Sequence, residues 1–156
     1  MFKQYSLIAK CKKDCIIKTL NSLCLLIFFG CIFSKAYAVD VIVHPSVSES
    51  KFTTSQLRRI YTMRQTQWAD GVRITAYVLP RQHSLHLRFT KDRLQMFPYQ
   101  LDRIWNKLTY SGLGVAPITV NTPEELINAI RKTPGAIGYV ESTKDMEAVN
   151  VVQIEK

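Results

Sequence analysis

From Val39 onward, the sequence alternates short apolar strands with amphipathic helices. Strand patterns cover residues 39–43, 72–79, 117–120, 137–140 and 149–154. Helix patterns lie between them, at about 53–64, 84–94, 98–111 and 122–133. Strands separated by helices predict an α/β fold with a mixed, mostly parallel sheet flanked by helices, because parallel neighbours need a crossover connection.

The helix starts carry recognisable signals. Thr53 is followed by Gln56 three residues later, and Thr122 by Glu125 at the same spacing, which is the pattern of a capping box. Pro98 suits the first turn of the third helix. An apolar stripe follows there at Leu101, Ile104, Trp105 and Leu108. We expect this stripe, including the tryptophan, to face the core.

The first 38 residues have the pattern of an export signal. Lysines make the start basic, and Leu23–Phe33 is an apolar run of 11 residues, shorter than the roughly 20 that a membrane-spanning helix needs. Ala36-Tyr37-Ala38 provides the small residues that signal peptidase reads. We therefore expect cleavage after Ala38, no membrane span after cleavage, and a periplasmic or secreted protein. The alternative is an uncleaved signal anchor, which the long basic region favours.

The remaining domain, residues 39–156, contains no cysteine, because all four cysteines lie within the first 31 residues. Its core must therefore be stable without a disulfide even in an oxidising compartment. The chain from Val39 to the end is long enough for a single core. No repeat, linker or second domain interrupts it.

The middle of this domain is strongly basic. Between Arg58 and Lys107 there are ten basic and three acidic side chains. Such a segment favours anionic partners. We expect no nucleic acid among them, because an exported protein rarely meets one and no arginine–aromatic recognition motif is present.

Arg81, His83 and Ser84 lie between a predicted strand end and a predicted helix start, where α/β sheets form ligand sites. Backbone N–H groups at a helix start attract anions. Arg81 can supply a bidentate fork, and Ser84 a helix cap and a hydroxyl donor. These three residues are our candidate anion-binding residues. The alternative is simple capping beside an exposed arginine.

Other chemistry finds little support in the sequence. His83 and His86 are three residues apart, but no acidic residue lies beside them at ligand spacing, so we expect no metal. A Ser84–His86 pair lacks a nucleophile elbow and an orienting acid, so we expect no enzyme and no cofactor.

The order of several motifs resembles a known family. The motifs are Leu57–Tyr61, the turn Trp68–Gly71, Trp105, and Thr133–Val140. Together they resemble the phosphate-binding protein of bacterial phosphate ABC transporters, especially the short relatives labelled phosphate transporter substrate-binding proteins. The resemblance covers about residues 40–152. It implies a type II periplasmic-binding-protein-like lobe over residues 39–156.

The resemblance also bears on the site. Full-size members resemble a two-lobed clamp that holds the anion between its lobes, whereas this chain resembles one lobe. The family's phosphate loop has an Arg followed closely by Gly-Ser-Gly-Thr. Here the loop reads Arg81-Gln82-His83-Ser84-Leu85, so the Arg and one Ser remain while both glycines and the Thr are absent.

Two functions follow from this resemblance. The first is an exported solute-binding-like protein that takes phosphate or a related oxyanion, weakly or as half of a site shared within a homodimer. The second is an interaction module of the same fold without a ligand, whose basic face docks an acidic envelope protein or a transporter component. Saturable stabilisation by free phosphate distinguishes the two.

Overall fold

The computed structural model describes residues 39–141 and 149–155, so the predicted signal of residues 1–38 lies outside the described residues. The strands in this part of the chain are β1 (Asp40–Val43), β2 (Lys51–Thr53), β3 (Thr75–Val78), β4 (Ile118–Thr119), β5 (Ala136–Val140) and β6 (Asn150–Glu155). The helices are α2 (Thr54–Tyr61), α3 (Ser84–Arg88), α4 (Pro98–Tyr110) and α5 (Pro123–Lys132), with a π-helix, η1 (Phe89–Arg93), directly after α3.

The six strands form one mixed sheet in the order β2-β6-β1-β5-β3-β4. β2 runs parallel to β6, and β3 runs parallel to both β4 and β5. Only β1 runs antiparallel to its neighbours, β5 and β6. The predicted α/β architecture with a mixed, mostly parallel sheet is thus confirmed.

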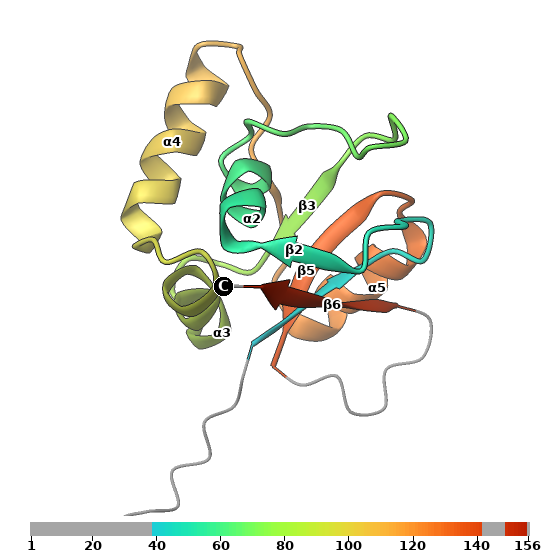
Figure 1. Ribbon diagram of the computed structural model, residues 1–156. Coiled ribbons are helices and arrows are strands. Elements are labelled where there is room, and N and C mark those ends of the chain that lie inside the picture. Colours follow the sequence, from blue (N-terminus) through green and yellow to red (C-terminus); the bar gives the residue numbers. More distant parts are fainter. Residues whose placement is uncertain (1–38, 142–148, 156) are drawn as a thin grey trace, which may run out of the picture. The chain divides into compact units, whose positions relative to one another are not determined.

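Helices cover both faces of this sheet. Figure 1 shows α5 on one side of the strands and α2 on the other. On the α5 side, Leu126 and Ile130 are fully buried, and they approach β5 at Gly138, where a side chain would collide with both. On the other side, α2 buries Leu57, Ile60 and Tyr61. The sheet is therefore a central layer whose middle strands are apolar on both faces.

The predicted helix starts are confirmed, but of each expected capping box only the threonine half is formed, and Glu125 Oε2 accepts from Asn121 N instead. Thr53 Oγ1 accepts a hydrogen bond from Gln56 N at 3.2 Å, and Thr122 Oγ1 accepts one from Glu125 N at 3.1 Å. α4 begins at Pro98. Of its predicted apolar stripe, Leu101 is buried, and Ile104, Trp105 and Leu108 are half-buried. Trp105 packs against the core while its indole N–H donates to the carbonyl of Tyr61. This bond ties α4 to the end of α2.

One strand and two element boundaries differ from the prediction. β2 was not expected, because only one of its three side chains, Phe52, is buried, and a single apolar residue gives no alternating pattern. β3 begins at Thr75 rather than at residue 72, since Val72 is exposed and Arg73 makes only an isolated bridge to Gln67. α2 ends at Tyr61, short of the predicted Arg64.

Within residues 39–141 and 149–155, no helix has both the length and the apolar character needed to cross a membrane.

Candidate anion-binding site

The three predicted anion-binding residues lie together on the surface at the carboxyl end of β3. Arg81 follows the strand after Leu79 and Pro80, and Ser84 opens α3. Arg81 and Ser84 are exposed, and His83 is half-buried. β3 lies between two parallel neighbours, and the carboxyl ends of such strands are where open α/β sheets bind ligands. The structure therefore agrees with the predicted position of this loop.

Arg81 already has an anionic partner. Its Nε lies 3.1 Å from Oδ2 of Asp102, which comes from the first half of α4 and is mostly covered. No sequence pattern predicts this pair, because the two residues belong to different elements. An incoming anion would have to share the guanidinium with Asp102, through the terminal nitrogens that this contact leaves.

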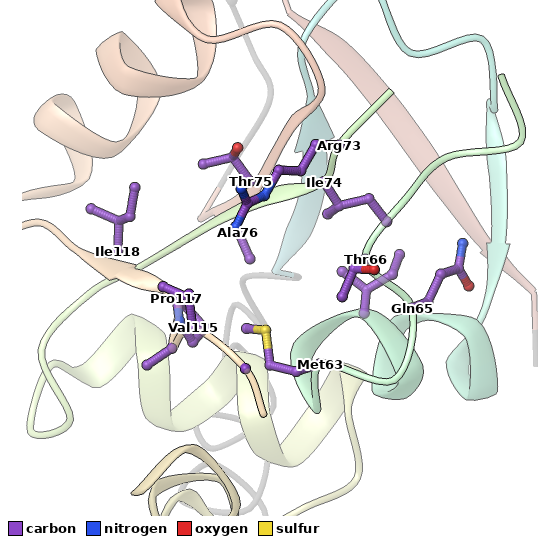
Figure 2. Close-up of a pocket in the computed structure, with 13 residues that line it drawn as sticks. Met63, Gln65, Thr66, Arg73, Ile74, Thr75, Ala76, Val115, Pro117 and Ile118 are labelled. Atoms are coloured by element: carbon purple, nitrogen blue, oxygen red, sulfur yellow. The ribbon is translucent and has the colours of Figure 1, made fainter. Parts of the chain in front are cut away.

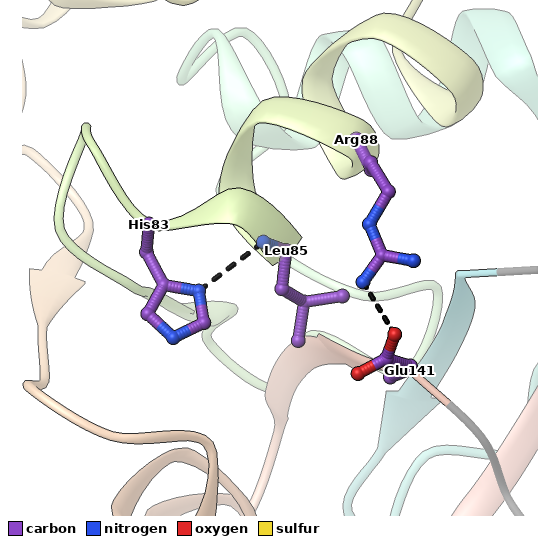
Figure 3. Close-up of polar contacts among 4 residues, drawn as sticks. All are labelled: His83, Leu85, Arg88 and Glu141. Atoms are coloured by element: carbon purple, nitrogen blue, oxygen red, sulfur yellow. Dashed lines mark hydrogen bonds and ion pairs between the residues drawn. The ribbon is translucent and has the colours of Figure 1, made fainter. Parts of the chain in front are cut away.

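The helix cap is His83 and not the predicted Ser84. Figure 3 shows the imidazole of His83 turned toward the start of α3, where its Nδ1 accepts a hydrogen bond from Leu85 N at 3.2 Å. Ser84 is the first helical residue. The ring thus occupies a backbone N–H that an anion at this helix start would otherwise use.

A buried polar network lies beneath the loop. The hydroxyl of Tyr139, on β5, accepts a hydrogen bond from Leu79 N at 2.9 Å and lies 2.6 Å from Nδ1 of His86. His86 is 1% exposed. Burial lowers the pKa of His86 to about 4, and the charge of Asp102 opposes this shift only in part. At neutral pH the imidazole is therefore uncharged, so one ring nitrogen donates and the other accepts, and the tautomer sets the direction of the hydrogen bond with Tyr139.

This network positions the loop and provides no metal site. His86 points into the core while His83 caps the helix, so the two histidines do not face a common point. Among the residues that the structure describes, no group of three His, Cys, Asp or Glu side chains could hold a metal ion. The contact from Tyr139 to Leu79 fixes the backbone directly before Pro80 and Arg81.

The basic middle of the sequence does not form one uniform cationic face. Arg81, Arg88 and Arg93 each form an ion pair, with Asp102, Glu141 and Asp40 in turn. The Arg88–Glu141 pair, also drawn in Figure 3, joins α3 to the residue after β5 at 2.7 Å. These contacts use part of the positive charge to hold elements together.

A pocket of about 270 Å³ lies away from the loop, between the end of α2 and the edge formed by β3 and β4. Figure 2 shows Met63, Thr66 and Val115 around it, with Arg73 at its border. Its walls are mainly apolar or uncharged. None of the three predicted anion-binding residues lines this pocket; Arg81 and Ser84 are exposed on the surface.

Neither a family model nor a curated protein matches the sequence. Solved structures do match. An ABC-type phosphate transport receptor from Vibrio cholerae superposes with a TM-score of 0.56 at 17% identity, over 76% of this chain and 46% of that chain. A putative phosphate ABC transporter substrate-binding protein with bound phosphate from Clostridium perfringens gives 0.58 at 16% identity, over 74% and 44%. PstS from Borrelia burgdorferi gives 0.56 at 18% identity, over 76% and 47%.

These matches concern the fold. The chain spans less than half the length of the proteins that it matches. The first is named as a transport receptor and the second as a substrate-binding protein. The described domain therefore has an α/β fold similar to about half of a phosphate ABC transporter substrate-binding protein.

Proposed function

We propose that the protein is an exported, solute-binding-like protein that binds phosphate or a related oxyanion through Arg81, His83 and Ser84. One observation carries the proposal. These three polar side chains lie at the carboxyl end of β3, in a domain whose fold resembles phosphate-binding proteins. This is the end of a parallel strand where such folds bind ligands.

The geometry supports weak binding by one copy of the domain. Asp102 competes for the guanidinium of Arg81, and the ring of His83 already accepts the N–H of Leu85. Few free donors remain on this open surface. We propose that affinity is low, or that a second copy of the chain completes the site in a homodimer.

Export is part of the proposal. The signal of residues 1–38 would be cleaved after Ala38 and leave a periplasmic or secreted domain of residues 39–156. Intact-mass analysis of the exported protein is expected to give a chain that begins at Val39. A mass that retains the signal would contradict this and place the protein at the membrane surface.

A second function rests on the differences between this loop and the phosphate loop of the family that the sequence resembles. Its phosphate-loop glycines are absent and its arginine is neutralised by Asp102. Both facts favour an interaction module that has lost its ligand and docks an acidic envelope protein or a transporter component through its basic residues.

Calorimetric titration of the exported protein with phosphate, with sulfate as the control anion, separates the two functions. We expect saturable, phosphate-selective binding that persists when salt is added. Arg81→Ala should weaken it by at least about tenfold. Arg88→Ala is the matched control, because it removes an arginine from the same helix region but outside the loop.

Asp102→Asn gives the sharpest test. It removes the carboxylate that competes for Arg81, so phosphate should bind more tightly to this variant than to the natural protein. Binding that is equal for both anions and is lost in salt would overturn the proposal. So would an Arg81→Ala variant with unchanged affinity.

A further inference from the structure

A second basic surface lies apart from the loop, in a groove of about 540 Å³ between α2, the segment that joins η1 to α4, and α4 itself. Both long helices that border it are labelled in Figure 1. The groove is lined by Ser55, Arg58, Arg59, Thr62, Arg64, Gln95, Met96, Gln100 and Ile104. We call it the arginine groove. None of Arg81, His83 and Ser84 lines it.

Its charge is entirely positive. Three arginines, Arg58, Arg59 and Arg64, line it, and no carboxylate does. No ion pair between described residues involves any of the three. Arg59 and Arg64 are exposed. Three neighbouring guanidinium groups repel one another unless an anion lies between them, so this groove favours an anionic occupant.

One of the arginines is held in place. Arg58 donates through Nε to the carbonyl of Leu94 and through Nη2 to Oε1 of Gln95, the latter at 2.8 Å. Gln95 has a φ of 49°, in the left-handed region that a non-glycine residue seldom adopts. Such strained residues cluster at binding sites. This backbone conformation places Gln95 at the border of the groove.

The uncharged groups of the groove also favour an anion. Oε1 of Gln95 accepts from Arg58, and Oε1 of Gln100 accepts from Phe97 N at 2.9 Å. Both amide oxygens are therefore used, while the amide NH₂ groups remain as donors. The Thr62 hydroxyl donates to the carbonyl of Arg58 at 2.6 Å, so only its acceptor lone pairs remain. The donors that the groove offers beside its positive charge are therefore the two glutamine NH₂ groups.

We propose that the arginine groove binds a small anion that carries several phosphate groups, at a site distinct from the loop of Arg81. All basic residues of the groove are arginines, whose planar fork binds phosphate oxygens in pairs, whereas lysine acts as a point charge. Its volume is within the range of small-molecule sites. Three cations match several phosphate groups better than a single one.

Tripolyphosphate is the probe that tests this proposal. It is titrated by calorimetry, at physiological ionic strength, into the exported protein purified after expression of the full chain. We expect one saturable site, with binding tighter than that of inorganic phosphate. The double variant Arg59→Gln, Arg64→Gln should lose at least about tenfold in affinity. Both side chains are exposed, so the variant should fold, and its circular dichroism spectrum checks this.

Two further variants test the role of the arginines. The first separates the paired hydrogen bonds of the guanidinium groups from their charge, and the second is a control for location. Arg59→Lys with Arg64→Lys keeps both charges and removes the forks, so it should bind more weakly than the natural protein but more tightly than the glutamine variant. Arg73→Gln is the matched control. It removes one exposed arginine that lines a different pocket, and its affinity should be unchanged.

The proposals for the two sites can be tested independently of each other. Arg81→Ala should leave tripolyphosphate binding intact, and the double glutamine variant should leave phosphate binding at the loop intact. Tripolyphosphate affinity that is unchanged in the double glutamine variant would overturn the proposal. An equal loss in Arg73→Gln would also overturn it, because it would show attraction to the whole basic surface rather than to the groove.

Discussion

At the residue scale, two buried tyrosines differ in how their hydroxyls are satisfied. The Tyr139 hydroxyl contacts both Leu79 N and His86 Nδ1. The Tyr61 hydroxyl is buried with no hydrogen-bond partner among the described residues. Burial raises the pKa of Tyr61 well above its usual value. A hydroxyl with partners contributes to stability, whereas one without them costs desolvation free energy.

These two tyrosines make a matched pair of substitutions. Tyr139→Phe leaves a buried amide and an imidazole nitrogen unpaired, so it should lower the free energy of unfolding by about 2–4 kcal/mol. Tyr61→Phe removes only a group without a partner and should be neutral, or stabilising by up to about 1 kcal/mol. Urea unfolding measures both. Equal losses in the two variants would contradict the network.

The buried His86 makes stability depend on pH. Its pKa is about 4 in the folded protein, against 6.5 for an unperturbed histidine. As pH falls, the unfolded chain therefore takes up the proton first. The contribution of the neutral imidazole is complete above pH 6.5 and is lost between pH 6.5 and 4. It amounts to about 3 kcal/mol.

Unfolding free energies measured from about pH 7 to 4 test this shift. The His86→Gln variant is the comparison, because it retains a hydrogen-bonding group for Tyr139 but does not titrate in this range. The natural protein should lose about 3 kcal/mol more than the variant over the interval. Parallel pH profiles would show that His86 titrates normally.

Single residues also mark what the sequence could not predict about the candidate site. The position of the loop followed from the strand and helix patterns on either side. The interaction partners of the loop could not be predicted from these patterns, because Asp102 and Tyr139 approach it from α4 and β5. The cap at His83 was missed because histidine is an uncommon cap, while Ser84 beside it is a usual one.

At the scale of elements, a glycine connects α5 to β5. Gly135 has a φ of 72°, and a Cβ there would lie 2.4 Å from the carbonyl oxygen of Arg73. Gly71 has a similar φ of 84°, but a Cβ there would meet nothing within 4 Å. The two positions share the same conformational demand and differ only in the space around them.

Alanine at these two glycines separates backbone strain from collision. Gly71→Ala should cost about 1 kcal/mol, from the left-handed conformation alone. Gly135→Ala should cost more than about 3 kcal/mol, since the Arg73 backbone must also move. Thermal melting of both variants measures the difference. A difference below about 1 kcal/mol would mean that the segments before β3 and β5 do not approach each other at Arg73 and Gly135 as described.

Pattern length decided which elements the sequence could predict. β1, α4 and α5 each present several apolar residues at a regular spacing, and all three were found near the predicted ranges. β2 has only Phe52 as a buried residue. It is held by the stacking of Phe52 on Trp68, 5.6 Å between centroids, and by pairing with β6. Neither contact can be read from local sequence.

At the scale of the whole molecule, the last strand joins distant parts of the chain. β6 lies between β1 and β2, and it is the strand with which β2 pairs. Its sequence predicts a strand at residues 149–154 but not its neighbours, because strand order depends on packing across the whole domain. The stability of the sheet should therefore depend on the buried face of β6.

Adjacent valines on β6 test this dependence. Val152 is 4% exposed and lies opposite Val41 on β1, whereas Val151 is 44% exposed and belongs to the other face of the strand. Val152→Ala removes two buried methyl groups and should lower the free energy of unfolding by about 2 kcal/mol. Val151→Ala should change it by less than about 0.5 kcal/mol. Urea unfolding of the two variants compares them directly. The reverse order would mean that β6 is shifted by one residue, because such a slip exchanges the two faces of a strand.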